Sequence, residues 1–127
     1  MKYIRKTSKT IEQASADLET AVVAHGFGVL HIHNLRQTMH KKGVEFAEEC
    51  LIFEVCNPHK AKQVLESDMS MNMALPCRIS VYSENGQNYI GMILPAALLS
   101  MLSDNDALKE VATEVEELSK LMIEDAV

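Results

Sequence analysis

The chain has no tryptophan and only three phenylalanines and three tyrosines among its 127 residues. Its hydrophobic residues, 47% of the total, are therefore mostly aliphatic and include eight methionines. That fraction is enough to bury a core in a domain of this size. We expect one domain over residues 1–127, because a second domain of ordinary size would not fit.

Long apolar runs are also missing. No stretch approaches the ~20 apolar residues that a membrane-spanning helix needs, so no membrane association is expected. The polar residues that follow Met1 do not resemble a secretory signal peptide. The three cysteines contain no Cys-x-x-Cys pair, which indicates reduced thiols, and these features together predict a cytoplasmic protein.

Positive charge is scarce, with 12 Lys and Arg against 18 Asp and Glu and a net charge of −6. An acidic domain repels a phosphate backbone, so no nucleic-acid partner is expected. The densest basic stretches, Lys41-Lys42 and the first few residues, are too short to overcome this repulsion. No glycine-rich phosphate-binding loop follows any expected strand.

Hydrophobic periodicity predicts helices interleaved with strands. The expected strands cover residues 3–7, 27–33, 49–56, 77–82 and 88–94. The expected helices start after residue 8 or 10, at 34, at 58, at 95 and at 104, and residues 68–75 are expected to be irregular. The Asn85-Gly86 step predicts a hairpin between the last two strands. These elements predict an α+β domain with a mostly antiparallel or mixed sheet of about five strands and helices packed on one face.

The last helix, residues 104–127, is expected to extend the core. Asp104 or Asp106 is the expected N-cap. Apolar side chains recur three or four residues apart and make one stripe, with acidic residues on the far side: Leu108, Val111, Val115, Leu118 and Met122. This stripe packs either on the same domain or on a partner subunit.

The junction between the strongest strand and the helix after it contains several candidate site residues. Asn57 is expected to cap the helix, with Pro58 at the first helical position. The functional alternative for Asn57 is an anion site formed by the backbone N–H groups of residues 59 to 61. Cys56 is a candidate nucleophile, because the helix dipole favours a thiolate and His59 lies within one turn. The alternative is that Cys56 is a small buried hydrophobe.

Side-chain alternation divides each strand between two faces. Leu30 and Ile32 are expected beneath the helices, whereas Val29 shares the opposite face with the neighbouring histidines. That opposite face is expected to carry polar side chains from three strands: His31, His33, Glu54, Cys56, Arg78, Ser80 and Tyr82.

Two groups of side chains could bind a metal. His31, His33 and Glu54 would make a two-histidine, one-carboxylate set, and the alternative is a solvated or dimer-buried sheet face. The alternating thioethers of residues 69–73 could bind copper(I), or could fill core gaps or coat an interaction surface.

Three segments resemble the bacterial and archaeal domain-of-unknown-function family 302: Phe27–Leu30, Glu54–Ala61 and Leu75–Tyr82. The markers are the Asn-Pro-x-x-Ala junction and the Leu-Pro-Cys strand entry, and the likeness covers nearly the whole chain. The resemblance implies a small α+β fold with a curved sheet, and homodimers. It supplies no catalytic residue. The Met-rich segment before Leu75 departs from the family pattern, and the helix from Asp104 onward is expected to run beyond the shared core.

The absence of a catalytic constellation with fixed geometry favours a non-enzymatic, homodimeric binding module for a small or anionic ligand, or for a protein partner. Seven residues are expected to bind the ligand: His31, His33, Glu54, Cys56, Asn57, His59 and Arg78. The alternative is a metal- or thiol-dependent enzyme that uses His31, His33, Glu54 and Cys56. A third hypothesis is that the last helix or the Met-rich segment binds a protein partner.

Overall fold

One five-stranded sheet organises the chain, in a computed structural model that describes residues 1–127. The strands are β1 (Lys2–Thr7), β2 (Gly28–Asn34), β3 (Cys50–Cys56), β4 (Cys77–Glu84) and β5 (Gln87–Ile93). Their order in the sheet is β1-β5-β4-β3-β2, and every neighbouring pair is antiparallel. Strands β2 to β5 thus form a meander, and β1 joins it beside β5.

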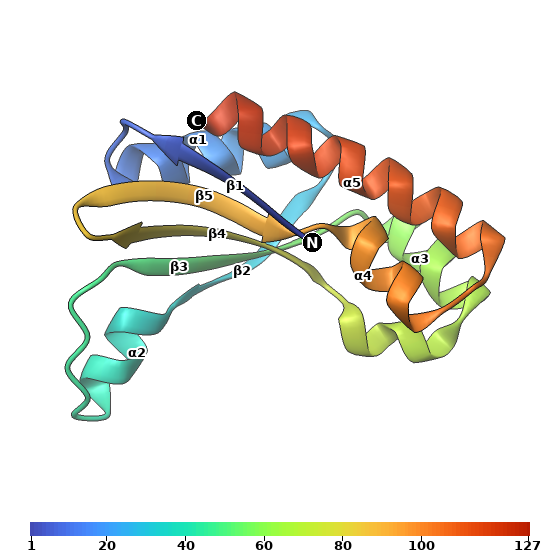
Figure 1. Ribbon diagram of the computed structural model, residues 1–127, viewed down its shortest axis with the longest axis horizontal. Coiled ribbons are helices and arrows are strands. Elements are labelled where there is room, and N and C mark those ends of the chain that lie inside the picture. The colour runs from blue at the N-terminus through green and yellow to red at the C-terminus, as the bar shows by residue number, and fades with distance from the viewer.

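Two helices, α1 (Ile11–Ala24) and α5 (Asp106–Ala126), pack against each other and cover one face of the sheet (Figure 1). The opposite face, called the open face below, is not covered by them. Three further elements gather beyond the end of the sheet: α3 (Pro58–Ser67), the 3₁₀ helix η1 (Met69–Ala74) and α4 (Pro95–Leu102). A short helix, α2 (Leu35–Lys41), projects from the other end (Figure 1). The predicted α+β fold is confirmed.

The main core lies between the sheet and the pair α1 and α5. As expected, it is mostly aliphatic, and Phe27 and Phe53 are its buried aromatic side chains. A second, smaller core holds together the elements beyond the end of the sheet: Val64, Met71, Leu99, Leu108, Val111 and Ala112. Because α5 contributes to both cores, its apolar stripe packs on its own domain.

Capping residues set where the helices begin. Thr10 caps α1 by accepting a hydrogen bond from the Gln13 N–H at 3.1 Å. Asn105 caps α5 by accepting from the Leu108 N–H at 3.1 Å, so the expectation of Asp104 or Asp106 is wrong. The chain is still extended at Asn105, and Asp106 is already the first helical residue. Residues 69–74 were expected to be irregular but form η1, whose first turn is capped by Asp68.

A β-bulge in β2 changes the expected faces of that strand. Val29 pairs with Val55 and His31 pairs with Glu54, so Leu30 is an extra residue without a partner. Val29 therefore packs against the main core, while Leu30 is 61% exposed. The predictions that Leu30 lies beneath the helices and that Val29 shares a face with the histidines are both wrong. His31 and His33 lie on the open face, as expected.

Candidate ligand-binding site

The sheet forks where β4 and β5 separate. The ladder between these strands ends at the pair Ser80 and Gly91. From there β4 continues to Cys77 beside β3, whereas β5 continues to Ile93 beside β1. Figure 1 shows the two strands diverging toward η1 and α4. The fork leaves a gap at this end of the open face.

Two prolines stand at the ends of the fork. Pro76 precedes β4, and Pro95 follows β5 at the first helical position of α4. Proline lacks a backbone N–H and cannot donate to a sheet ladder, so neither branch can extend its pairing past these points. On one side the chain continues in η1 and on the other in α4, and residues of both elements line the gap.

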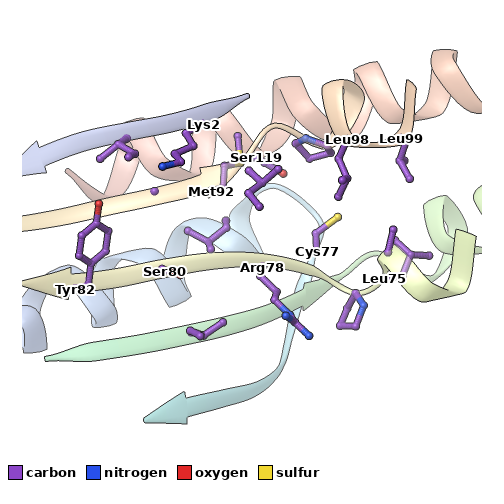
Figure 2. A pocket seen from close by; sticks show the side chains of 18 of the residues that line it. Lys2, Leu75, Cys77, Arg78, Ser80, Tyr82, Met92, Leu98, Leu99 and Ser119 are labelled. Atoms are coloured by element: carbon purple, nitrogen blue, oxygen red, sulfur yellow. The ribbon is translucent and has the colours of Figure 1, made fainter. Parts of the chain in front are cut away.

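A groove of about 430 Å³ occupies the fork. Figure 2 shows its two sides, with Leu75, Cys77 and Arg78 on the β4 side and Leu98, Leu99 and Ser119 opposite them. Nineteen residues line it, of which 12 are hydrophobic: Lys2, Ile4, Ile52, Met73, Ala74, Leu75, Pro76, Cys77, Arg78, Ile79, Ser80, Tyr82, Gly91, Met92, Ile93, Pro95, Leu98, Leu99 and Ser119.

The charged residues of the groove are both cationic. Lys2 and Arg78 line it from opposite sides, and no Asp or Glu does. Neither cation forms an ion pair, although six other Lys and Arg residues do. The register of β3 and β4 places Glu54 opposite Arg78, but the Glu54 carboxylate is hydrogen-bonded to His33. The groove lining thus carries two cations and no carboxylate in a protein of net charge −6, although the Arg78 charge also acts on Glu54, whose pKa it helps to lower.

Three hydroxyl groups add polarity to the lining. Ser80 and Tyr82 lie on β4, and the Tyr82 ring stacks on Tyr89 with 5.3 Å between ring centroids. Burial raises the pKa of Tyr82, so its hydroxyl keeps its proton at neutral pH. Ser119 comes from α5, behind the sheet, and is only 1% exposed. Its Oγ has no hydrogen-bond partner in the protein.

The sequence-predicted trio of His31, His33 and Glu54 does come together, outside the groove. His33 Nε2 is hydrogen-bonded to Glu54 Oε1, and the two imidazole rings meet edge to face with centroids 4.4 Å apart. The hydrogen bond to His33 is the main reason that the pKa of Glu54 is lowered. No group of three or more His, Cys, Asp or Glu side chains in the chain is arranged to hold a metal ion.

Asn57 performs the predicted capping role and joins two parts of the chain. Its Oδ1 accepts from the N–H groups of His59 and Lys60 at 3.0 and 3.2 Å, and its Nδ2 donates to the Gly26 carbonyl at 3.1 Å. The Ala61 N–H bonds to the Asn57 carbonyl. All three N–H groups of the anion hypothesis therefore already have partners within the protein.

The cysteines are protonated thiols at neutral pH. Burial raises the pKa of Cys56, which disfavours the thiolate that the nucleophile hypothesis needs, and no hydrogen bond joins Cys56 to the exposed His59. Burial, with a smaller contribution from nearby Cys56, raises the pKa of Cys77 to about 11. Of the seven predicted ligand-binding residues, Arg78 alone lines the groove.

Comparisons with known proteins identify the family. The model described as "Domain of unknown function DUF302" matches residues 3–126. The chain belongs to the DUF302 family. A crystal structure of an uncharacterized conserved DUF302 protein from Bacillus stearothermophilus superposes with a TM-score of 0.94 at 33% sequence identity, covering 99% of this chain and 98% of that chain. No curated protein matches significantly.

The DUF302 match confirms the resemblance found in the sequence and corrects one detail. It extends to residue 126 and so includes α5, which was expected to run beyond the shared core. Even α5, the longest helix at 21 residues, is too polar to cross a membrane, and no other helix of this DUF302 chain has the length and hydropathy to do so.

Most groove residues of this DUF302 chain were missed by sequence reasoning. Lys2, Ile93 and Ser119 meet only because β1 pairs with β5 and α5 packs behind them. No local pattern reports that pairing. The available signal was a proline at the outer end of each of two neighbouring strands, which indicates that both strands lose their partner at the same end of the sheet.

Proposed function

We propose that this DUF302 protein is a binding module that holds a small organic molecule in the groove between β4 and β5. The observation that carries the proposal is the groove itself, a concave and mostly apolar space of about 430 Å³ with a few polar groups. Small-molecule sites in proteins are typically apolar clefts of roughly 300–1,000 Å³ with a small number of polar groups that orient the ligand.

The polar groups of the groove suit recognition better than catalysis. Arg78 and Lys2 supply positive charge, and Ser80 supplies a neutral hydroxyl. Cys77 is the one thiol in the lining, and with a pKa of about 11 it is a weak nucleophile at neutral pH. A metal- or thiol-dependent enzyme remains the alternative function, and it has less support from these side chains.

Blocking the groove tests the proposal. Ile93 is 53% exposed and lines the groove, so Ile93→Trp should fill the space at little cost to folding. Leu121 is 49% exposed on α5 and lies outside the lining, so Leu121→Trp is the matched control. A metabolite library is screened for compounds that raise the melting temperature. We expect hits whose effect is lost in Ile93→Trp and kept in Leu121→Trp.

Two results would count against a binding function. One is a library without any hit on the wild-type protein. The other is a set of hits that respond equally to both tryptophan substitutions, which would place their binding outside the groove. Circular dichroism of each variant shows that it is folded before the screen is interpreted.

We further propose that the protein assembles as a homodimer through β2 and the segment after it. β2 is an edge strand, and α2 with the chain that follows it projects from the sheet (Figure 1). Apolar side chains are exposed along this segment, among them Leu30 at 61%, Val44 at 52% and Phe46 at 44%. An unpaired strand edge beside exposed apolar side chains favours association with another chain.

Sedimentation of a double variant tests the dimer. Leu30→Ser with Phe46→Ser should convert a dimer to a monomer at micromolar concentration, because both side chains would be buried by the partner. Leu121→Ser is the control, since Leu121 is 49% exposed on α5 and lies outside β2 and the segment after it. A wild-type monomer, or a dimer that survives the double change, would refute this assembly.

A further inference from the structure

We infer that the groove takes an organic anion with an apolar body, whose charge sits between Lys2 and Arg78 and whose inner end carries a polar atom that meets Ser119. The inference rests on the proposed binding function and adds the chemical class of the ligand and its orientation. Its three parts come from the charge of the lining, the second cavity beside the groove, and the unpartnered Ser119 hydroxyl.

The lining of the groove lacks acidic residues. The chain has 18 Asp and Glu residues, yet none of them lines the groove. Lys2 and Arg78, one on each side, form no ion pair. The carboxylate that neighbours Arg78 in the register, Glu54, is hydrogen-bonded to His33 and lies outside the lining. Two unpaired cations facing one cavity favour an anionic ligand over a neutral or cationic one.

A second cavity beside the groove indicates how the ligand is oriented. A second space of about 250 Å³ adjoins the groove, because the two linings share Leu75, Pro76, Cys77, Pro95 and Leu99. Most of its lining is hydrophobic, and its one charged residue, Lys60, is already paired with Glu114. Placing an unpaired charge among such side chains is costly, whereas an apolar group gains from being buried there. The anionic end of a ligand therefore stays at the open face, and its apolar body lies within the groove, whose lining, unlike that of the second cavity, includes Ser119.

Ser119 lies at the inner end of the groove. Lys2 and Arg78 reach the groove from strands of the sheet, whereas Ser119 reaches it from α5, which covers the opposite face. Its hydroxyl is buried and has no partner, and native proteins leave few such groups unsatisfied. A ligand with a hydrogen-bonding atom on its inner end would complete this site.

Four probes of equal chain length test the ligand class by calorimetry, each below its critical micelle concentration. These are decanoate, decanol, decyltrimethylammonium and ω-hydroxydecanoate. We expect decanoate to bind at least about tenfold more tightly than decanol, and the cation to bind most weakly, because charge-assisted hydrogen bonds are the stronger ones. The preference for decanoate should decrease as salt is added.

Charge-reversal variants test whether Lys2 and Arg78 bind the anionic group of decanoate. Lys2→Glu with Arg78→Glu should reduce decanoate affinity to the level of decanol or below. Lys41→Glu is the control, because Lys41 is an unpaired cation on α2, far from the groove (Figure 1). Equal loss in the control would overturn the assignment of the charge to the groove.

Ser119→Ala tests the inner end. The wild-type protein should prefer ω-hydroxydecanoate to decanoate, and Ser119→Ala should remove that preference while decanoate still binds. The same preference in both proteins would overturn the role of Ser119. The variant itself should be at least as stable as the wild type, because it removes an unsatisfied buried hydroxyl.

The outcomes separate the ligand class from the binding function. If decanol and decanoate bind equally and both are lost in Ile93→Trp, the groove is a binding site but the anion inference is wrong. If no probe binds while a library compound does so and is lost in Ile93→Trp, the inference fails and the binding function stands. If nothing binds at all, both fail.

Discussion

The hydroxyl of Tyr3 donates a hydrogen bond to the carboxylate of Glu124, which ties the first strand to the last helix. Arg5 donates to both oxygens of the same carboxylate. The Lys120 ammonium lies 5.7 Å from the centroid of the Tyr3 ring. The hydrogen bonds from Tyr3 and then Arg5 lower the pKa of Glu124. One carboxylate therefore holds two residues of β1 against α5.

Replacing Glu124 should weaken this connection in a pH-dependent way. A carboxyl whose pKa is lowered on folding stabilises the fold above its unfolded pKa, about 4.3 for Glu, and loses that contribution as the pH falls through its folded pKa. Urea denaturation of Glu124→Gln should thus show a lower midpoint than wild type at pH 7, and the two should converge in acid. The exposed Glu117, changed to Gln, should behave like wild type throughout. A difference that persists undiminished in acid would contradict this role.

Asn57 should contribute to stability through both ends of its side chain. Asn57→Ala removes the cap of α3 and the bond to the Gly26 carbonyl, and should cost about 1–2 kcal/mol of unfolding free energy. Asn57→Asp keeps the acceptor for the helix N–H groups but loses the donor, so a smaller loss is expected. Chemical denaturation gives both values. Equal losses in the two variants would mean that the cap itself adds little.

Two glycines of the sheet, Gly91 on β5 and Gly28 on β2, should respond oppositely to alanine. A Cβ on Gly91 would lie 3.1 Å from Ile4 Cγ1 and 3.2 Å from the Tyr3 carbonyl oxygen, so β1 would have to move. Gly91→Ala should therefore cost about 1–3 kcal/mol. A Cβ on Gly28 meets nothing within 4 Å, so Gly28→Ala should be neutral or should stabilise by up to about 1 kcal/mol. Thermal and urea unfolding measure both, and a destabilised Gly28 variant would contradict the prediction.

The Cys77 thiol should resist alkylation until the solution is strongly alkaline. Cys50→Ser with Cys56→Ser leaves Cys77 as the only thiol. Because the thiolate is the reactive form, the iodoacetamide rate of the folded variant should rise through a midpoint above the ordinary 9.0 and no higher than about 11, since burial still raises the pKa of Cys77 while the smaller contribution of Cys56 has been removed. In denaturant the midpoint should fall toward the ordinary value of 9.0. Coincident profiles in the two states would show that burial does not protect this thiol.

The features predicted correctly from the sequence depend on neighbouring residues. Asn57 and Pro58 start α3 because a capping side chain followed by proline favours a helix start in almost any context. Asn85 and Gly86 form the predicted hairpin because both adopt positive φ, at 51° and 79°. The spacing of apolar residues likewise predicted which face of α5 packs on the core. Each of these signals lies within a few residues of the feature that it predicts.

The features that were missed depend on pairing between distant segments. The extra residue at Leu30 is visible only when β2 is set beside β3, because alternation along β2 alone places Leu30 among the buried residues. The fork requires knowing that Lys2 pairs with Ile93 while Cys77 pairs with Val55. The cap of α5 was missed for another reason. Asp104, Asn105 and Asp106 can all cap a helix, and the sequence does not show that Asn105 is the last residue with an extended backbone before the helix begins.

The place of β1 in the sheet also has a consequence for how the protein folds. Strands β2 to β5 can pair in the order in which they are synthesised, each with the strand before it. β1 must wait for β5, and closing a loop that encloses most of the chain is slow because of its entropy. We therefore expect β1, the first of these five strands along the chain, to be the last to find its partner. The wall of the groove that rests on β1 forms only at that final step.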